Sequence, residues 1–312
     1  MIKRLATVLA VVLLSVGYAI AQQAQPQSGI PGVIASGAQV ELVSEGYTFA
    51  EGPLGTPDGG LLFTDLRGAN RIHRLDANGN ISVFREKSNG ANGLAYTRSG
   101  DLVAVEAVEL RISITRADGR VEELSRGDGK IKLSQPNDLF VDSKGGVYFT
   151  DPGLRPTPPG VKPFTYYLPA GSDKAIVIDD QITRPNGLTL TQDEKILIVA
   201  DTIGHTVWQF DVAPDGTVRN RRPFAQIRDV AEGSDSGADG LAIDRDGRLF
   251  VTSVRGVQVF DKTGQYLGII TVPRRPSNVA FSGPDKRVLY ITAVSALYRI
   301  PTLTQGPERR GK

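Results

Sequence analysis

The chain alternates short apolar runs with polar turns, and one pair of such runs recurs along its length. The reference copy, NDLFVDSKGGVYFTD from Asn137, joins two runs of β-branched and aromatic residues through the turn-forming sequence DSKGG. This pattern predicts a β-hairpin. Five further copies of the pattern start at Glu51, Asn92, Asn186, Asp239 and Asn278.

A second strand–turn–strand stretch follows most copies of this hairpin. Examples are RIHRLDANGNISVF after the first copy and VQVFDKTGQYLGII after the fifth. One unit is therefore four antiparallel strands over roughly 40 to 50 residues, which is typical of a β-propeller blade. We predict an all-β chain in which residues 38–304 form a single domain, a six-bladed β-propeller.

The sixth copy ends after its third strand, ALYRI, and so lacks a fourth. The strand-like sequence QVELV, at residues 39–43, precedes the first copy and belongs to no other unit. We predict that this N-terminal strand completes blade six, because that arrangement closes the ring and removes an exposed sheet edge.

The N-terminus has the pattern of a secretory signal. In residues 1–21, Lys3 and Arg4 precede an apolar run and an A-x-A site, whereas a membrane anchor would need about 20 apolar residues. We expect cleavage of this signal, a flexible leader over 22–37, and a C-terminal tail over 305–312. The mature protein would then be periplasmic or secreted, without membrane attachment.

Composition excludes several classes of chemistry. The chain contains no cysteine, so disulfides, thiolate metal sites and cysteine nucleophiles are absent. There are two histidines and no G-x-S-x-G sequence, so no Ser-His-Asp hydrolase pattern is present. Basic residues are dispersed and the net charge is +2, which argues against a nucleic-acid partner. The sequence leaves the oligomeric state open.

The polar residues that open the six hairpins are the main candidate site. The first strand of each propeller blade lines a central channel, so these residues should meet at one end of it. They are Glu51, Asn92, Asn137, Asn186, Asp239 and Asn278. Turn chemistry explains Asn-Gly and Asp-Gly pairs, but glutamate is a weak turn former.

Carboxylate and amide oxygens are ligands for hard divalent cations, so the ring predicts a bound Ca²⁺, with Mg²⁺, Mn²⁺ or Zn²⁺ as alternatives. Zinc is the least suited to this set, because it usually draws on Cys or His. Asp138 is expected to point away from the channel by the two-residue alternation of a strand.

Four motifs resemble the senescence marker protein/gluconolactonase/luciferin-regenerating enzyme family. They are EGP at 51–53, QPND at 135–138, RPNGL at 184–188 and ADGLAID at 238–244. The resemblance implies a six-bladed propeller with a divalent cation in its channel, and several members hydrolyse sugar lactones.

By that resemblance, Glu51, Asn186 and Asp239 match the metal ligands. Asn137 matches an asparagine beside metal and substrate that ligates directly in some relatives, and Asp239 also matches the proposed catalytic acid/base. Gln135 occupies a position where the animal branch carries arginine, and so resembles the bacterial lactonases.

These observations predict a metal-dependent lactonase acting on a small-molecule sugar lactone. The metal would polarise the carbonyl, and Asp239 would either activate water or attack directly. Asn137, Asn92 and His205 are the predicted substrate-binding residues. Two alternatives remain, a phosphotriesterase-like hydrolase using the same metal site and a non-catalytic ligand-binding propeller.

The walls of the pocket are predicted from the loops that open on the same face. The long segments 152–164 and 225–238 should cover the metal end. Asp65, Asp151 and Asp201 end second strands on that face, and we interpret them as blade-turn residues or as residues that support the ligands, rather than as ligands themselves.

Overall fold

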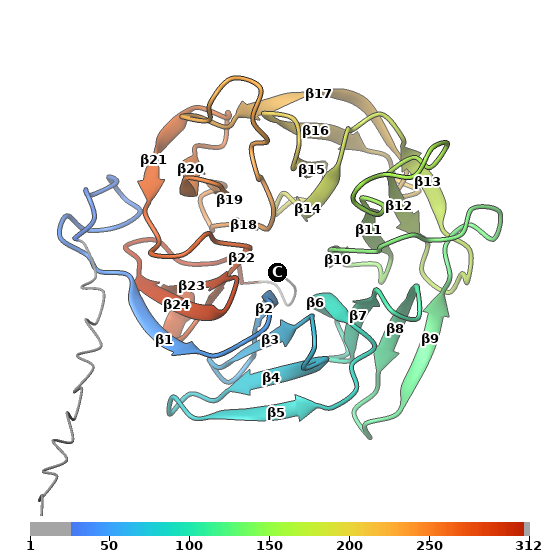
Figure 1. Ribbon diagram of the computed structural model, residues 1–312, viewed down its shortest axis with the longest axis horizontal. Coiled ribbons are helices and arrows are strands. Elements are labelled where there is room, and N and C mark those ends of the chain that lie inside the picture. The colour runs from blue at the N-terminus through green and yellow to red at the C-terminus, as the bar shows by residue number, and fades with distance from the viewer. Residues whose placement is uncertain (1–25, 309–312) are drawn as a thin grey trace, which may run out of the picture.

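The computed structural model describes residues 26–308, and its strands form six four-stranded antiparallel sheets around a central axis (Figure 1). The predicted six-bladed propeller is confirmed. The only helical segment in the described part is a 3-10 turn at Pro284–Lys286. No helix among these residues has the length and apolarity that a membrane span requires. The predicted signal lies outside the described residues.

Each blade runs outward from the axis in chain order. Blade one is β2 (Ala50–Gly55), β3 (Leu61–Asp65), β4 (Arg71–Leu75) and β5 (Ile81–Arg85), and blade two is β6 (Ala91–Tyr96), β7 (Leu102–Glu106), β8 (Arg111–Thr115) and β9 (Val121–Ser125). Blade three is β10 (Leu139–Val141), β11 (Val147–Asp151), β12 (Phe164–Leu168) and β13 (Ile176–Asp179), and blade four is β14 (Pro185–Leu190), β15 (Ile196–Asp201), β16 (Thr206–Val212) and β17 (Val218–Gln226). Blade five is β18 (Leu241–Ile243), β19 (Leu249–Ser253), β20 (Gly256–Phe260) and β21 (Tyr266–Ile270).

The chain ends close the ring in blade six. This sheet has the order β22 (Asn278–Ser282), β23 (Val288–Ala293), β24 (Ala296–Pro301) and β1 (Glu41–Glu45), so the N-terminal strand is its outer edge. Arg299 of β24 pairs with Glu41 of β1, and their side chains form an ion pair at 2.9 Å. The predicted closure is confirmed. The strand starts at Glu41 rather than at Gln39, and Val40 before it is buried in the core.

Residues 26–37 do not behave as the predicted flexible leader. Ile30, Val33 and Ile34 are buried in a core cluster with residues of blades five and six. The side chain of Gln27 donates to the carbonyl of Thr271 (3.2 Å) and accepts from its amide (2.8 Å). The apolar residues of this segment cover the outer part of those blades, so it is part of the domain.

The predicted tail also packs where it is described. The backbone amide of Gly306 donates to the carbonyl of Lys286 (2.8 Å), and Arg245 donates to the carbonyl of Gln305 (2.9 Å). These contacts lie at the turns joining the first and second strands of blades five and six. Residues 305–306 therefore lie on the face opposite to the strand-one starts.

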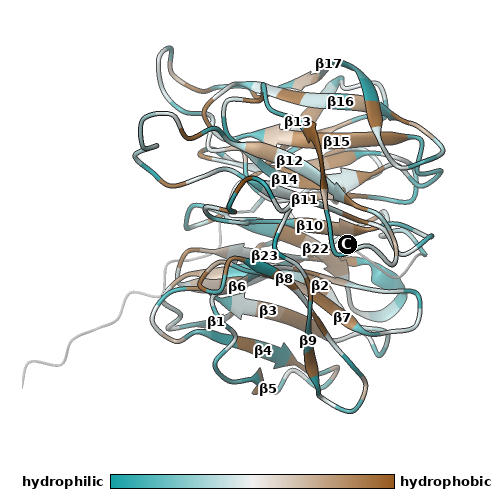
Figure 2. Ribbon diagram, turned by 90° about the vertical axis from the view of Figure 1, so that its right-hand side faces the viewer, coloured by the Kyte–Doolittle hydropathy of each residue, from teal (hydrophilic) through white to brown (hydrophobic). Residues whose placement is uncertain are grey.

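The core lies between the blades, because the strands near the axis are buried on both of their sides. All five residues of β11, VYFTD, are buried. Between blades three and four, Phe140, Tyr148 and Leu188 form one cluster, and Trp208 packs against it. In the side view apolar colour follows the strands (Figure 2). Burial between blades stabilises the ring at about 25 cal/mol per Å² of apolar surface.

Hydroxyl side chains connect the inner parts of neighbouring blades. Each donates to a backbone carbonyl at or just before the first strand of the next blade. The bonds are Thr64 to Asn92 (3.3 Å), Thr150 to Asn186 (2.7 Å), Thr202 to Ala238 (2.9 Å), Thr252 to Ser277 (2.9 Å) and Ser277 to Ala50 (2.7 Å). These bonds fix the strand starts relative to one another, and the candidate site is built from those starts.

One of these hydroxyls allows a matched test. Thr150 on β11 lies directly opposite Thr165 on β12, and both are fully buried. The Thr150 hydroxyl bonds the Asn186 carbonyl, whereas the Thr165 hydroxyl has no hydrogen-bond partner among the described residues. We expect Thr150→Val to lower the free energy of unfolding by about 1–3 kcal/mol, and Thr165→Val to be neutral or stabilising. Denaturant unfolding measures both, and equal effects would contradict this assignment.

Candidate metal and substrate site

The six residues predicted from the repeat meet at one end of the axis. We call the face where the first strands begin the mouth face. The inner strands contact their neighbours in sequence around the ring, β2 to β6, β10, β14, β18, β22 and back to β2. The Gly93 amide donates to the Asn137 carbonyl (2.9 Å), and Gly187 donates to the Asp239 carbonyl (3.2 Å). The structure thus brings the predicted residues together, and their roles as ligands stay predictions.

Glycine follows four of the six residues because neighbouring blades approach closely there. A Cβ on Gly52, whose φ is +43°, would lie 1.9 Å from the carbonyl oxygen of Asn92. A Cβ on Gly187 would lie 2.2 Å from the carbonyl oxygen of Asp239. Neither distance is tolerable for a side chain. The polar-Gly pairs therefore reflect tight packing around the axis rather than hairpin turns.

Three polar side chains form a buried network across the axis. The Asn278 Nδ2 donates to Glu51 Oε2 at 3.0 Å and to Asp138 Oδ2 at 3.3 Å. Glu51, Asp138 and Asn278 are each at most 3% exposed. Because blades three and six face each other in a six-membered ring, the contact from Asp138 to Asn278 crosses the axis.

The prediction that Asp138 points away from the axis is wrong. Regular pairing in blade three starts only at Leu139, so the two-residue alternation of a strand does not apply to the preceding residues. The Asp138 Oδ1 accepts instead from the Leu139 amide at 2.9 Å. Asn137 beside it is partly exposed. A third carboxylate therefore belongs to this site.

The amide oxygens of the asparagines are suited to binding a cation. Asn186 Nδ2 donates to Thr202 Oγ1 at 2.9 Å, which fixes the amide orientation. The Oδ1 atoms of Asn92 and Asn186 are buried and have no hydrogen-bond partner among the described residues. Orphaned acceptors of this kind are costly without a ligand or water.

The carboxylates alone would not make a metal site. Within residues 26–308, no group of three or more His, Cys, Asp or Glu side chains is arranged to hold a metal. A cation at the mouth face would therefore depend on the amide oxygens as well as Glu51 and Asp239. This donor set contains only oxygen atoms and few charged groups. Such a set suits a hard divalent cation.

The two long loops meet on the mouth face, as predicted. Arg155, in the segment after β11, forms an ion pair with Asp235, in the segment before β18. The His205 Nε2 lies 2.8 Å from the carbonyl oxygen of Ser234 in the same loop. His205 thus supports the loop that leads to Asp239, and its predicted contact with substrate stays a prediction.

Arg184 is a further residue of the mouth face, and the repeat pattern does not predict it. Its Nη1 donates to the carbonyl of Pro152 at 3.1 Å, and its side chain is partly buried. Burial lowers the pKa of the guanidinium, Arg155 lowers it further, and the Asp239 and Asp235 carboxylates oppose both. The only signal in the sequence was its place in RPNG, two residues before Asn186.

The comparison with protein families agrees with this geometry. Residues 49–295 match the family model described as the SMP-30/Gluconolactonase/LRE-like region. The chain belongs to this family. A gluconolactonase of Zymomonas mobilis is 26% identical over 300 residues, covering 86% of this chain and 82% of the relative. The diisopropyl-fluorophosphatase of Loligo vulgaris is 26% identical, covering 80% and 87%.

A solved structure described as a gluconolactonase from Xanthomonas campestris has the same fold as this member of the SMP-30/gluconolactonase/LRE-like family. Its TM-score is 0.78 at 29% identity, and the match covers 89% of this chain and 94% of that one. Most of the described propeller therefore has a counterpart in the family.

Three aspartates at the ends of second strands have structural roles. Asp65 accepts from the Phe49 amide (2.9 Å), Asp151 from the Gln135 amide (2.7 Å) and Asp201 from the Arg184 amide (3.0 Å). Each carboxylate thus holds the segment that leads into a first strand. The interpretation of these residues as blade-turn residues is confirmed.

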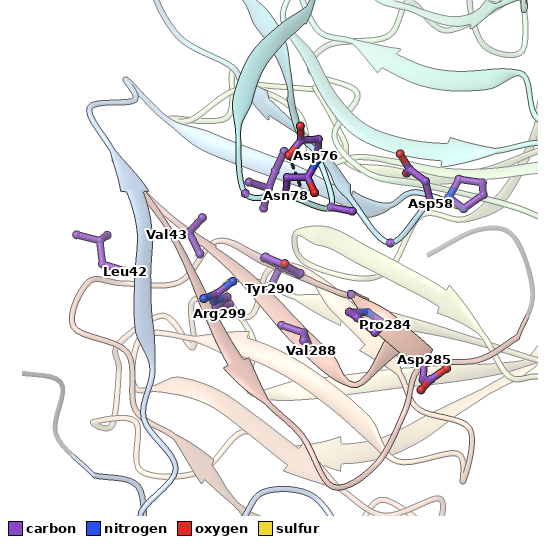
Figure 3. Close-up of a pocket in the computed structure, with 16 residues that line it drawn as sticks. Leu42, Val43, Asp58, Asp76, Asn78, Pro284, Asp285, Val288, Tyr290 and Arg299 are labelled. Carbon is purple, nitrogen blue, oxygen red and sulfur yellow. Dashed lines mark hydrogen bonds between the residues drawn. The ribbon is translucent and has the colours of Figure 1, made fainter.

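A cavity of about 730 Å³ lies elsewhere, at the seam between blades one and six (Figure 3). Its walls include Asp58, Asp76 and Arg299. These charged groups have local partners, since Asp76 caps its own turn, Arg74 pairs with Asp58 at 2.5 Å and Arg299 pairs with Glu41. The cavity opens beside turns on the face opposite the mouth face, so it is separate from the candidate site.

Proposed function

We propose that this protein is an exported, divalent-metal-dependent hydrolase that opens the ester ring of a sugar lactone. The observation that carries the proposal is the oxygen-rich ring at the mouth face, where neighbouring inner strands carry Glu51 and Asp239, and where the buried amide oxygens of Asn92 and Asn186 have no hydrogen-bond partner among the described residues. The relatives named gluconolactonase, over most of the chain, support lactones as the substrate class. The N-terminal signal pattern supports export.

Glu51, Asn186 and Asp239 would hold the cation, with Asn137 beside it, and Ca²⁺ is the ion that this donor set favours. When bound, such a cation supplies Lewis-acid polarisation of the ester carbonyl. Glu51 is suited to a fixed ligand position because the Gly52 amide (2.8 Å) and Asn278 both donate to its Oε2.

Asp239 is the residue best placed to move a proton. It is partly exposed on the mouth face, and the Asp239 amide donates to the carbonyl of Thr252 (3.2 Å), which holds its backbone. In the proposed reaction, Asp239 takes a proton from water as the water oxygen bonds to the carbonyl carbon. The ring C–O bond then breaks, and the leaving alkoxide receives the proton, giving a hydroxy acid.

A phosphotriesterase-like activity is the second candidate. It is favoured by the similarity to diisopropyl-fluorophosphatase, which extends over 80% of this chain. The same carboxylate and amide oxygens would serve a phosphoryl centre, because hard cations polarise phosphoryl and carbonyl oxygens alike.

Removal of the metal tests the proposal. We expect the purified protein to hydrolyse at least one lactone in a panel of aldono-1,4- and 1,5-lactones. Chelation should reduce turnover by more than about 100-fold, and added Ca²⁺ should restore it. Circular dichroism before and after chelation is the control for folding. Unchanged turnover in the metal-stripped protein would contradict the proposal, and hydrolysis of phosphotriesters alone would favour the second candidate.

A further inference from the structure

Arg184 has a fixed position at the edge of the candidate site. It immediately precedes β14, and its amide donates to Asp201 while its Nη1 donates to the carbonyl of Pro152. Pro152 follows the last residue of β11, so the guanidinium bridges blades three and four on the mouth face. The carboxylate of Asp239 lies within electrostatic range of it.

The charge of Arg184 has no direct counter-ion. Within residues 26–308, Arg184 forms no ion pair, whereas Arg155, the other arginine nearby, is paired with Asp235. Partly burying a guanidinium without a carboxylate is unfavourable, because lost hydration is not replaced by an opposite charge. One neutral carbonyl satisfies only one of its five N–H groups.

We propose that Arg184 binds a carboxylate carried on the lactone ring, so that the preferred substrate is an acidic sugar lactone. This inference rests on the proposed function. The planar fork of arginine matches a carboxylate with two parallel hydrogen bonds. A monoanionic carboxylate also adds less negative charge beside Asp239 than a dianionic phosphate would.

Two lactones of equal ring size test the inference. D-glucaro-1,4-lactone and D-glucono-1,4-lactone differ at the position remote from the ester, which is a carboxylate in the first and a hydroxymethyl in the second. We expect the wild-type protein to prefer the acidic lactone in kcat/KM. Arg184→Gln, which still donates to a carbonyl, should lose about 10- to 100-fold on the acidic lactone and less than about 3-fold on the neutral one.

Arg155→Gln is the matched control. It removes a nearby positive charge that is already paired with Asp235, so it should change both substrates by less than about 3-fold. Arg184→Lys should restore only part of the preference, because an ammonium lacks the planar fork. Equal losses on both lactones in Arg184→Gln would indicate a role in holding Pro152 alone, and would overturn the inference.

Binding separates this inference from the proposed function. Calorimetric titration with D-glucarate and D-gluconate requires no turnover. We expect glucarate to bind the wild-type protein at least about 10-fold more tightly, and Arg184→Gln to remove that difference. If this result appears without hydrolysis of any lactone, the proposed function fails and the carboxylate site stands. If neutral lactones are hydrolysed and glucarate shows no advantage in binding, the carboxylate site fails and the proposed function stands.

Discussion

Replacing Asp239 by asparagine is expected to reduce lactone hydrolysis by about 10²- to 10⁴-fold, the range associated with a lost acid/base group. The substitution keeps the shape of the side chain and one carbonyl oxygen, but removes the negative charge and the site that accepts a proton. Asp239 is partly exposed at the axis, and Gly187 of the neighbouring blade donates to its backbone carbonyl. The backbone should therefore stay in place, and turnover at saturating lactone is the measurement.

Asp235→Asn is the control for this prediction. Asp235 belongs to the same loop, but its carboxylate pairs with Arg155 on the surface, so hydrolysis should fall less than about 3-fold. Calorimetric titration with Ca²⁺ separates two roles. If Asp239→Asn still binds Ca²⁺ but no longer hydrolyses the lactone, Asp239 acts in proton transfer. If the variant loses both Ca²⁺ binding and turnover, Asp239 is a metal ligand. Retained turnover would exclude Asp239 from the reaction.

Glu106→Gln is expected to cause the largest loss of stability, about 3–5 kcal/mol. The side chain of Glu106 is fully buried at the end of β7, and it accepts hydrogen bonds from Arg85 (2.6 Å), Arg111 (2.7 Å) and Ser113 (2.7 Å). The amide cannot neutralise the two arginines, which are only 12% and 18% exposed. Denaturant midpoints measure the loss. Glu122→Gln, on an exposed pair with Arg116, should cost less than about 1 kcal/mol.

The same residue predicts a dependence on pH. Burial alone would raise the pKa of Glu106, but the hydrogen bonds from Ser113, Arg85 and Arg111 outweigh it and hold the pKa below its ordinary value. A carboxyl with a lowered folded-state pKa stabilises the fold above its unfolded pKa, and that contribution is lost as the pH falls through the folded value. The difference in the free energy of unfolding between the wild type and Glu106→Gln should therefore become smaller at acidic pH. A constant difference from pH 7 to pH 3 would contradict the assignment.

The sequence predicted the fold and the members of the ring because both follow from one repeated pattern. A hairpin that recurs with a polar residue at its start specifies which residue of each blade faces the axis. The same regularity explains the error at Asp138, since the two-residue alternation holds only within the regular part of β10, which starts after Asp138.

Contacts between blades could not be predicted from that repeated pattern. The bond from Asp138 to Asn278 joins residues 140 positions apart, and no local periodicity encodes it. Arg184 is not predictable for the same reason, because its hydrogen bond to the carbonyl of Pro152 joins two blades. The packing of residues 26–37 depends on apolar faces of blades five and six, so a short sequence rich in Gly and Pro looked like a leader.

The pairing of β1 with β24 also affects how the chain folds during its synthesis. The first strand of the propeller to be synthesised, β1, can pair only after the last strand, β24, has been made, and roughly 250 residues separate them. At about 5 to 20 residues per second, the ribosome needs roughly 10 to 50 s to supply the partner. Throughout that interval blade six is incomplete and the ring is open. The nascent chain therefore carries an unpaired strand edge until β24 emerges, and during this period a chaperone would find the propeller incomplete.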